Sequence, residues 1–404
     1  MKDRQETRFG EPVSRIEPTL LDRVPAKVLD VMAEFIARAT ILGDALHPRT
    51  AQQLASLVRV MNAYYSNLIE GHVTRPRDIE RALSGDLDVD EGRRNLQIEA
   101  AAHVRLQESL DQSFAQGQLP DPVSPDFLRD LHRRFYEGAS EEMLRIKSDH
   151  RSFLMTPGRF RNDPGEDVVV GRHQPPSSER VQAFMQRFAE RYAHTKLSTS
   201  GRILAVAAAH HRFNYIHPFA DGNGRVSRLM SHAMIQHAGL GAHGLWSVSR
   251  GLARGLESRG EYKRMMDHAD SPRQGDLDGR GNLSLSALED FTEWFLKVCL
   301  DQVNFTSSLF DLPNLKQRLK LYVDRSGRLK PEAYLLLEEA VHRGEFARGD
   351  ADRITRLPER TARDVLAQVI AEGLLGSDTP KGPVSLRFPS HTLDLLFPQL
   401  FPAA

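Results

Sequence analysis

Residues 217–228 combine side chains and backbone features that could act together on one substrate. Their sequence is His-Pro-Phe-Ala-Asp-Gly-Asn-Gly-Arg-Val-Ser-Arg. His217 is the one side chain in this segment whose unperturbed pKa lies near neutrality, so it is a candidate general base. Asp221 offers the hard oxygen ligand that Mg²⁺ prefers when phosphate groups complete its coordination shell.

The rest of the segment is suited to phosphate groups. Gly222 and Gly224 flank Asn223 just before a helical apolar pattern, and glycine permits positive φ and close approach of the backbone. Successive N–H groups at the start of a helix bind anions. Arg225 and Arg228 lie in the first turns of that helix and suit phosphate oxygens. The segment therefore predicts a nucleotide site with a general base. The sequence has neither a Walker A motif nor a kinase glycine-rich loop.

This segment resembles the signature of the Fic family, His-Pro-Phe-x-Asp/Glu-Gly-Asn-Gly-x-x-x-Arg, and matches it at every specified position. Position 227 is Ser where many family members have Gly, at a position that varies. The helix upstream is also similar to Fic proteins, at Ala207, Ala208, His210, Phe213 and Ile216. The resemblance covers roughly residues 25–305 of the chain.

The resemblance implies a protein adenylyltransferase that moves AMP from ATP to a Ser, Thr or Tyr hydroxyl and releases pyrophosphate. ATP would be the substrate and Mg²⁺ the cofactor, and the acceptor would be a target protein, which could be the enzyme itself. His217 would take the hydroxyl proton, and Asp221 would hold Mg²⁺. The backbone of Gly222, Asn223 and Gly224 would bind phosphate oxygens. Arg225 and Arg228 would clamp the leaving pyrophosphate, with Arg228 on the γ-phosphate.

A second, shorter pattern lies near the N-terminus. Residues 66–71 read Ser-Asn-Leu-Ile-Glu-Gly, which is similar to the inhibitory pattern of some Fic proteins. Ser66 and Glu70 are four residues apart and share a helix face. The resemblance implies that Glu70 pairs with Arg228 and displaces the γ-phosphate of ATP. Because this pattern precedes the Fic signature in the same chain, inhibition would be intramolecular.

Two other functions are consistent with these residues. One is a hydrolase in which the same site removes AMP from a target and Glu70 orients a water molecule. The other is a DNA-binding regulator that uses the site only to sense ATP, against which the intact His217 argues.

The elements that must position these residues are predicted to be helices, because apolar residues recur at helical spacing along most of the chain. The expected helices span residues 26–42, 51–70, 75–83, 93–116, 124–138, 177–195, 200–214, 225–238, 258–269 and 285–303. Residues 158–176 break this pattern with a β-branched run and a turn signal, and they are predicted to form a β-hairpin. That hairpin is similar to the Fic flap that holds the target segment.

A break at Leu312-Pro313-Asn314 is taken as the domain boundary. Beyond it, three expected helices and a hairpin over 374–388 predict a winged helix-turn-helix domain. Basic residues near its second helix are interspersed with acidic ones, so docking of a protein is favoured over DNA contact. The predicted fold is all-α, a mainly helical Fic fold with a small β-hairpin flap and this added domain. The predicted division is 1–24 (N-terminal extension), 25–305 (Fic domain with the inhibitory helix 51–71) and 315–404 (winged helix).

Composition sets broad limits on the function. The 404 residues carry no formal net charge, so no global field draws the chain to nucleic acid or membrane. The single cysteine, Cys299, excludes a disulfide within the chain and indicates a reducing compartment. With a charged N-terminus and no long apolar run, a cytoplasmic protein is expected, with a homodimer left open. Cys299 and His210 are expected in the core, His210 as a hydrogen-bonded histidine rather than a metal ligand.

Overall fold

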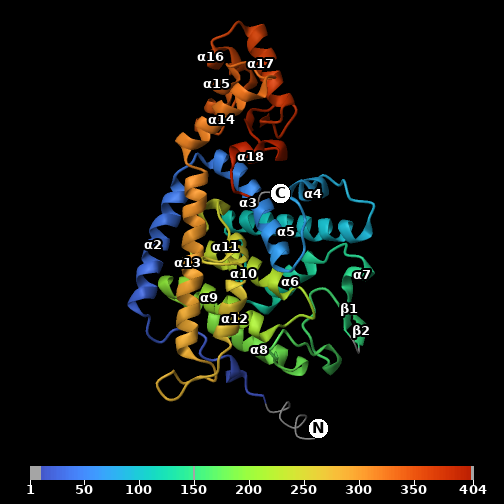
Figure 1. Ribbon diagram of the computed structural model, residues 1–404, viewed down its shortest axis with the longest axis vertical. Helices are drawn as coiled ribbons and strands as arrows, with labels where there is room; N and C mark the ends of the chain where they lie inside the picture. The colour runs from blue at the N-terminus through green and yellow to red at the C-terminus, as the bar shows by residue number, and fades with distance from the viewer. Residues whose placement is uncertain (1–10, 149–150, 402–404) are drawn as a thin grey trace.

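The computed structural model describes residues 11–148 and 151–401, so the first ten residues of the expected N-terminal extension lie outside it. The described chain is mainly helical (Figure 1). Its first part contains α2 (Ala26–Asp44), α3 (Pro48–Ile69), α4 (Pro76–Leu83), α5 (Glu91–Ala115), α6 (Pro125–Phe135), α7 (Glu141–Leu144), α8 (Ser178–Tyr192), α9 (Thr199–Ile216), α10 (Asn223–His237), α11 (Ser249–Arg254), α12 (Glu261–Ala269) and α13 (Leu285–Leu309). Short 3₁₀ turns span Val13–Ile16, Pro164–Glu166, His194–Lys196 and Ala242–Gly244.

The last 90 or so residues form a separate group of elements at one end of the molecule, beyond α13 (Figure 1). The helices there are α14 (Leu312–Ser326), α15 (Ala333–Arg343), α16 (Ala351–Thr355), α17 (Glu359–Ala371) and α18 (Leu393–Leu396), with 3₁₀ turns at Arg348–Asp350 and Ser390–Thr392. Three short strands, β3 (Glu345–Phe346), β4 (Leu375–Gly376) and β5 (Val384–Leu386), form an antiparallel sheet in the order β3-β5-β4.

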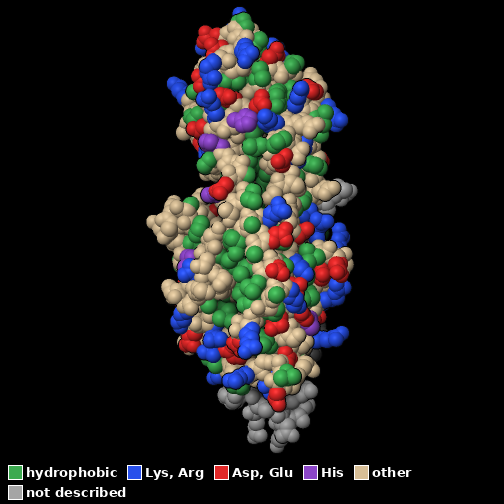
Figure 2. All heavy atoms as spheres, turned by 90° about the vertical axis from the view of Figure 1, so that its left-hand side faces the viewer, with side chains coloured by type: hydrophobic (Ala, Val, Ile, Leu, Met, Phe, Trp, Pro, Cys, Tyr) green, Lys and Arg blue, Asp and Glu red, His purple; other side chains and the backbone are tan. Residues whose placement is uncertain are grey.

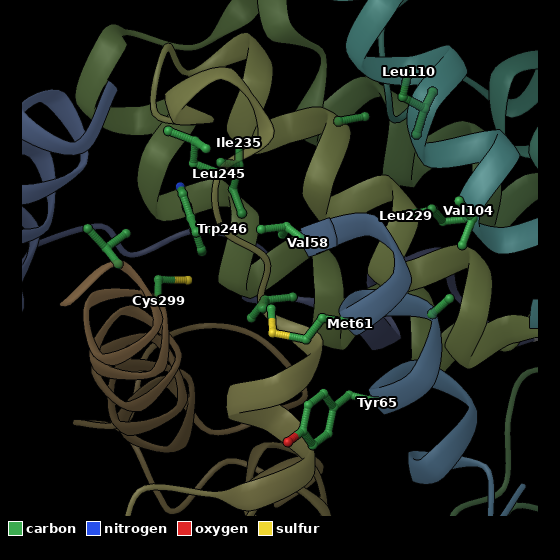
Figure 3. Packing of buried hydrophobic residues seen from close by; sticks show 14 of the residues in the cluster. Val58, Met61, Tyr65, Val104, Leu110, Leu229, Ile235, Leu245, Trp246 and Cys299 are labelled. Atoms are coloured by element: carbon green, nitrogen blue, oxygen red, sulfur yellow. The ribbon is translucent and has the colours of Figure 1, made fainter. Parts of the chain in front are cut away.

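The core that supports the site lies around α9 and α10. The two helices pack against each other, and α9 is buried around most of its circumference, as expected of a central helix. Helix α3 packs on α5 and α11, and α5 also packs on α10. Figure 3 shows side chains of α3, such as Val58 and Met61, pointing into the same apolar cluster as Leu229 of α10. This packing fixes the rotation of α3 and therefore the direction in which its last turn points.

The helices predicted over residues 26–303 are found within about three residues of their expected ends, except that α13 continues to Leu309, beyond its expected end at residue 303. Local signals explain the ends of α3. Pro48 stands at its start, where a missing N–H costs nothing, and His47 Nδ1 accepts the N–H of Arg49 at 3.2 Å. Gly71 follows its last turn with φ +84°, the left-handed conformation that stops a helix.

The predicted hairpin over residues 158–176 is wrong. The structure has a 3₁₀ turn and a single antiparallel bridge, Val170 to His173, in this segment. Two of its backbone carbonyls are bound by a side chain instead of a partner strand, since Arg151 donates to the carbonyls of Gly165 (2.7 Å) and Asp167 (3.1 Å). The valine run lies on the surface, with Val169 72% exposed, so its β propensity has no sheet to join.

The hairpin lies just upstream instead. Strand β1 (Arg145–Ser148) pairs antiparallel with β2 (Arg151–Leu154), in a register that places Ile146 opposite Phe153. The two strands are short and rich in Arg and Lys, so their composition does not resemble that of a buried strand.

Leu312-Pro313-Asn314, interpreted from the sequence as a break, begin a helix in the structure. Leu312 and Pro313 are the first turn of α14, and the Asp311 side chain caps it by accepting the N–H of Asn314 at 3.2 Å. Proline is favoured in a first helical turn, so this proline starts a helix and does not mark a linker. The helical path is interrupted only between Leu309 and Leu312.

Helix α3 touches the C-terminal elements along its length. Thr50 Oγ1 in its first turn donates to the carbonyl of Val341 at 3.0 Å. Near its other end, Tyr65 Oη donates to the carbonyl of Leu400 at 3.4 Å, and the Tyr64 ring meets Phe401 edge-on at 5.7 Å. The predicted inhibitory helix is therefore shared between the two parts of the chain.

The face formed by α2 and α13 carries both signs of charge interspersed with hydrophobic side chains (Figure 2). No single-sign field covers it, in keeping with the zero net charge of the sequence. Over residues 11–148 and 151–401, none of the helices combines the length and apolarity needed to cross a bilayer. Cys299 is buried as predicted, and burial raises the pKa of its thiol.

Candidate active site

The loop between α9 and α10 is held in one shape by its own asparagine. Asn223 Oδ1 accepts the N–H of Phe219 at 2.9 Å, and Asn223 Nδ2 donates to the Phe219 carbonyl at 2.9 Å. The Phe219 ring is fully buried and anchors the loop in the core. Gly222 precedes α10 with φ +78°, which glycine adopts without strain. The structure thus places residues 217–224 as a compact turn at the N-terminus of α10.

His217 ends α9 in the left-handed conformation, with φ +50° and ψ +61°. Its backbone carbonyl accepts a hydrogen bond from Arg161 Nε at 2.8 Å. Burial, followed by the positive charge of Arg161, lowers the pKa of His217 to about 4, against a smaller upward effect of a hydrogen bond with the Asn214 backbone. The imidazole is therefore neutral at physiological pH and able to take up a proton.

This shift predicts the titration of His217. Because the folded protein disfavours the imidazolium, the ring should stay neutral as the pH falls from 7.5 to 5.5 and take up its proton near pH 4. Nitrogen NMR of labelled protein without nucleotide would show this, with the His217 signal assigned from its loss in His217→Ala. A midpoint between pH 6 and 7 would mean that the ring is more hydrated than its position indicates.

Asp221 has the features of a ligand for a metal that is shared with phosphate groups. Its side chain is 47% exposed, and its Oδ2 accepts hydrogen bonds from Tyr136 Oη and Arg225 Nη2, each at 3.0 Å. Burial raises the pKa of Asp221, but the charge of Arg225 and the hydrogen bonds from the Gly222 backbone and Tyr136 together outweigh it, so the net pKa shift is downward and the carboxylate stays ionised. Among the described residues no cluster of three or more His, Cys, Asp or Glu side chains could enclose a metal. A single carboxylate beside the glycine turn, here called the phosphate cradle because its N–H groups at the start of α10 suit phosphate, is a donor set that would fit Mg²⁺ held mainly by phosphate oxygens.

Arg225 is buried and already engaged by acidic groups. Its Nη1 lies 2.7 Å from Glu99 Oε1, and its Nη2 lies 3.0 Å from Asp221 Oδ2. The guanidinium also lies over the ring of Phe135, 5.1 Å from its centroid. In this arrangement the Arg225 guanidinium points toward the Asp221 carboxylate of the loop.

Arg228 and Glu70 meet, as the sequence predicts. Arg228 Nη2 is 2.6 Å from Glu70 Oε1, and its Nε donates to Ser66 Oγ at 2.9 Å. The Ser66 carbonyl accepts a further bond from Nη2 at 3.1 Å. The Arg228 side chain is 1% exposed and that of Glu70 is 32% exposed. Ser66 and Glu70, the two residues predicted from the sequence, therefore both bind N–H groups of the Arg228 guanidinium at the end of α3.

Glu70 also lies against the glycine turn itself. A Cβ atom at position 224 would overlap Glu70 Oε1 and lie 3.0 Å from Arg228 Nη1. Burial raises the pKa of Glu70, but the charge and hydrogen bond of Arg228 outweigh it, so the pKa shifts downward and the group is an anion at neutral pH. The carboxylate thus stands where the N-terminus of α10 and Arg228 would both attract a phosphate.

The segment after the hairpin reaches the same loop. The N–H of Arg161 donates to the Pro218 carbonyl at 2.8 Å, and Phe160 packs on Phe219 with ring centroids 5.0 Å apart. Residues 158–176 therefore lie beside His217 as expected, although they are not the predicted hairpin.

His210 is a buried, hydrogen-bonded histidine, as predicted. Its Nδ1 is 2.9 Å from Ser231 Oγ and its Nε2 is 2.8 Å from Tyr262 Oη. Burial lowers its pKa to about 3, so it is neutral and structural.

Four side chains at the site were not found from the sequence. These are Glu99, His132, Tyr136 and Arg161. His132 and Tyr136 are four residues apart on the helix expected over 124–138, which is a signal that they share a face, but nothing in the sequence tells which element that face meets.

Comparison with known proteins agrees with this geometry. Residues 122–235 match the Fic/DOC family. The chain therefore carries a Fic/DOC domain, and the loop from His217 to Arg228 lies within it. The Ser66 and Glu70 pair lies outside the matched residues.

Its homologues include proteins named protein adenylyltransferase Fic. The one from Drosophila ananassae is 42% identical over 83 residues, which is 20% of this chain and 16% of that protein. The one from Drosophila melanogaster is 41% identical over the same length. The match thus spans a small part of these relatives.

Two solved structures share the fold over more of the chain. A Fic family protein from Desulfovibrio desulfuricans aligns over 92% of this chain and 99% of its own, with a TM-score of 0.52 and 18% identity. Fic-1 from C. elegans aligns over 70% of this chain and 72% of that chain, with a TM-score of 0.51 and 16% identity. At these identities the likeness concerns the fold alone.

Proposed function

We propose that this protein is a nucleotidyltransferase that moves AMP from ATP to a hydroxyl group of a target protein. The observation that carries this proposal is the placement of a neutral His217, an ionised Asp221 and the Arg228 guanidinium around one glycine turn at the N-terminus of α10. The homologues named protein adenylyltransferase support it.

In the proposed reaction the hydroxyl oxygen of the target attacks the α-phosphorus of ATP. The bond from that phosphorus to the oxygen bridging the α- and β-phosphates breaks, pyrophosphate leaves, and His217 takes the hydroxyl proton. The N–H groups at the start of α10 stabilise the charge that develops on the phosphate oxygens. Mg²⁺ held by Asp221 and by the phosphates would neutralise charge on the leaving group.

We propose further that Glu70 holds the enzyme inactive. Arg228 can pair with the Glu70 carboxylate or with the γ-phosphate, and the two anions cannot share one buried guanidinium. With Glu70 in place, ATP would bind weakly or with its phosphates turned away from in-line attack.

The position of Glu70 also favours a second candidate, removal of AMP from a modified target. A carboxylate on the rim of the phosphate cradle could orient a water molecule toward the phosphorus. The two activities differ in their dependence on this residue, because loss of Glu70 would raise transfer and lower hydrolysis.

The C-terminal elements are proposed to be a winged helix that docks a protein, with DNA as the less favoured partner. Helices α15 to α17 and the β3-β5-β4 sheet support this assignment. Arg353 is 3.4 Å from Glu339, and Arg363 pairs with Glu359 on α17. These pairs leave less positive charge for a phosphate backbone.

The position of the radioactive label on ATP tests the proposed reaction. The Glu70→Gly protein with α-labelled ATP and Mg²⁺ should label protein acceptors, itself among them, whereas γ-labelled ATP should not. Because the metal neutralises leaving-group charge, EDTA should remove most of the α-label incorporation. Transfer of γ-label would make the protein a kinase. Incorporation that is equal in EDTA and in Mg²⁺ would remove the metal from the mechanism.

A further inference from the structure

Helix α6 holds the loop that carries Asp221 from outside the family signature. His132 Nε2 lies 3.1 Å from the backbone carbonyl of Asp221, and the His132 ring is stacked on Phe219 at 3.9 Å between centroids. Tyr136, one turn further along, ends the same helix and reaches the Asp221 carboxylate. The main chain and the side chain of Asp221 are thus both bound by one helix.

The hydrogen bonds of His132 define its tautomer. Its Nδ1 accepts the N–H of Gly158 at 2.8 Å, so the proton of the neutral ring is on Nε2, which donates to the Asp221 carbonyl. The backbone of the loop at Asp221 is therefore tied to both α6 and the segment after the hairpin.

Tyr136 fixes the direction of the carboxylate. Its hydroxyl donates to Asp221 Oδ2 at 3.0 Å and accepts from Arg225 Nη2 at 2.9 Å. Arg225 Nη2 lies 3.0 Å from the same Oδ2, so Oδ2, the Tyr136 hydroxyl and Arg225 Nη2 form a triangle of hydrogen bonds. Neither Tyr136 nor Arg225 binds Oδ1 in this triangle.

The glycine that follows makes room for this contact. A Cβ atom at position 222 would lie 2.9 Å from Tyr136 Oη, closer than side-chain carbons approach. Gly222 therefore serves a second purpose beyond its positive φ, because it lets the phenol reach the carboxylate of the preceding residue.

We propose that Tyr136 is a positioning residue that, with Arg225, holds Asp221 Oδ2 so that Oδ1 is presented to the divalent cation bound with ATP. This inference rests on the proposed nucleotide site. Groups that hydrogen-bond a metal-binding carboxylate orient it, and their loss costs about 10- to 100-fold in metal affinity or activity. The phenol would act on the metal only through Asp221 and would not touch substrate.

The test separates metal dependence from general damage. In the full-length Glu70→Gly protein, calorimetry would measure the ratio of ATP affinity in Mg²⁺ to ATP affinity in EDTA. Tyr136→Phe keeps the ring and removes one hydroxyl, and it should lower this ratio about tenfold, with affinity in EDTA unchanged. Tyr192→Phe is the matched control, because Tyr192 lies on α8 and its buried hydroxyl donates to the Thr19 carbonyl at 2.7 Å. It should leave the ratio unchanged.

The outcomes are distinct. Equal ratios in Tyr136→Phe and its parent would overturn the proposal, as would a fall of the same size in EDTA and in Mg²⁺, which would indicate damage to the phosphate cradle. A parent ratio near one would also overturn it, since no bound metal would remain to be positioned. The proposed function fails separately. A tenfold lower ratio without α-label transfer would keep the role of Tyr136 and assign the site to other chemistry of metal-bound ATP.

Discussion

Replacing His217 should reduce AMP transfer by about 10²- to 10⁴-fold, the usual contribution of a positioned general base, and leave ATP binding nearly intact. The ring acts on the proton of the acceptor hydroxyl, so its loss should appear in turnover and not in nucleotide affinity. The measurements are α-label incorporation and ATP binding by calorimetry, both in the Glu70→Gly background.

The backbone at this position decides which variants are informative. His217 has φ +50°, a conformation that asparagine tolerates better than alanine. His217→Asn should therefore fold as the parent does and still lack a base, and it should be as inactive as His217→Ala. His237→Ala, at the other end of α10, is a matched histidine control that should keep activity. A His217→Asn protein that no longer binds ATP would show that this histidine serves the nucleotide and not the acceptor.

Replacing Glu70 by glycine should raise AMP transfer by roughly ten- to a hundredfold, about 1.4–2.8 kcal/mol of barrier. The 2.6 Å ion pair with Arg228 would be gone, and the guanidinium would be available to the γ-phosphate. Displacements of about 1 Å at a reacting group cost on the order of a hundredfold in rate, so freeing this position should have a large effect. Glu70 caps α3 at φ −78° and ψ 0°, so the glycine enters an unstrained backbone.

Three further variants test the charge of Glu70 and its dependence on Arg228. Glu70→Gln keeps the size of the side chain and removes its charge, and it should activate less than glycine. Arg228→Ala should not activate, because the γ-phosphate loses its partner too. The Glu70→Gly, Arg228→Ala double variant should be as poor as Arg228→Ala alone, since the two residues act as one unit. A wild type as active as Glu70→Gly on the same acceptor would make residues 66–71 an ordinary helix end.

The sequence predicts a contact where both of its residues belong to short motifs of known relation. The contact between Glu70 and Arg228 joins residues 158 positions apart, and it was predicted because both belong to patterns whose relation the family resemblance supplied. The helices followed from apolar spacing. The same spacing is present in α14, where Leu315, Leu319 and Val323 are buried, but the interpretation of Leu312-Pro313-Asn314 as a break leaves this helix unpredicted.

Contacts that depend on how elements pack could not be predicted. Tyr136 reaches Asp221 only because α6 lies against the loop, and no local pattern encodes that approach. The hairpin was misplaced for the same reason, because propensity identified a valine run at 168–170 whose surroundings provide no strand to pair with. Strands Arg145–Ser148 and Arg151–Leu154 form despite a charged composition.

The position of α3 between the two parts of the chain has a thermodynamic consequence. Tyr65, which binds the Leu400 carbonyl, immediately precedes Ser66, which binds Arg228. If Glu70 leaves the site by movement of α3, the same movement disturbs the contacts with residues 340–401. Thermodynamic linkage then makes the two effects equal. Nucleotide binding weakens this packing by the same free energy by which loosening of the packing favours nucleotide binding. A molecule that binds the C-terminal elements only when they are detached from α3 would therefore act as an activator at a distance, without touching the phosphate cradle.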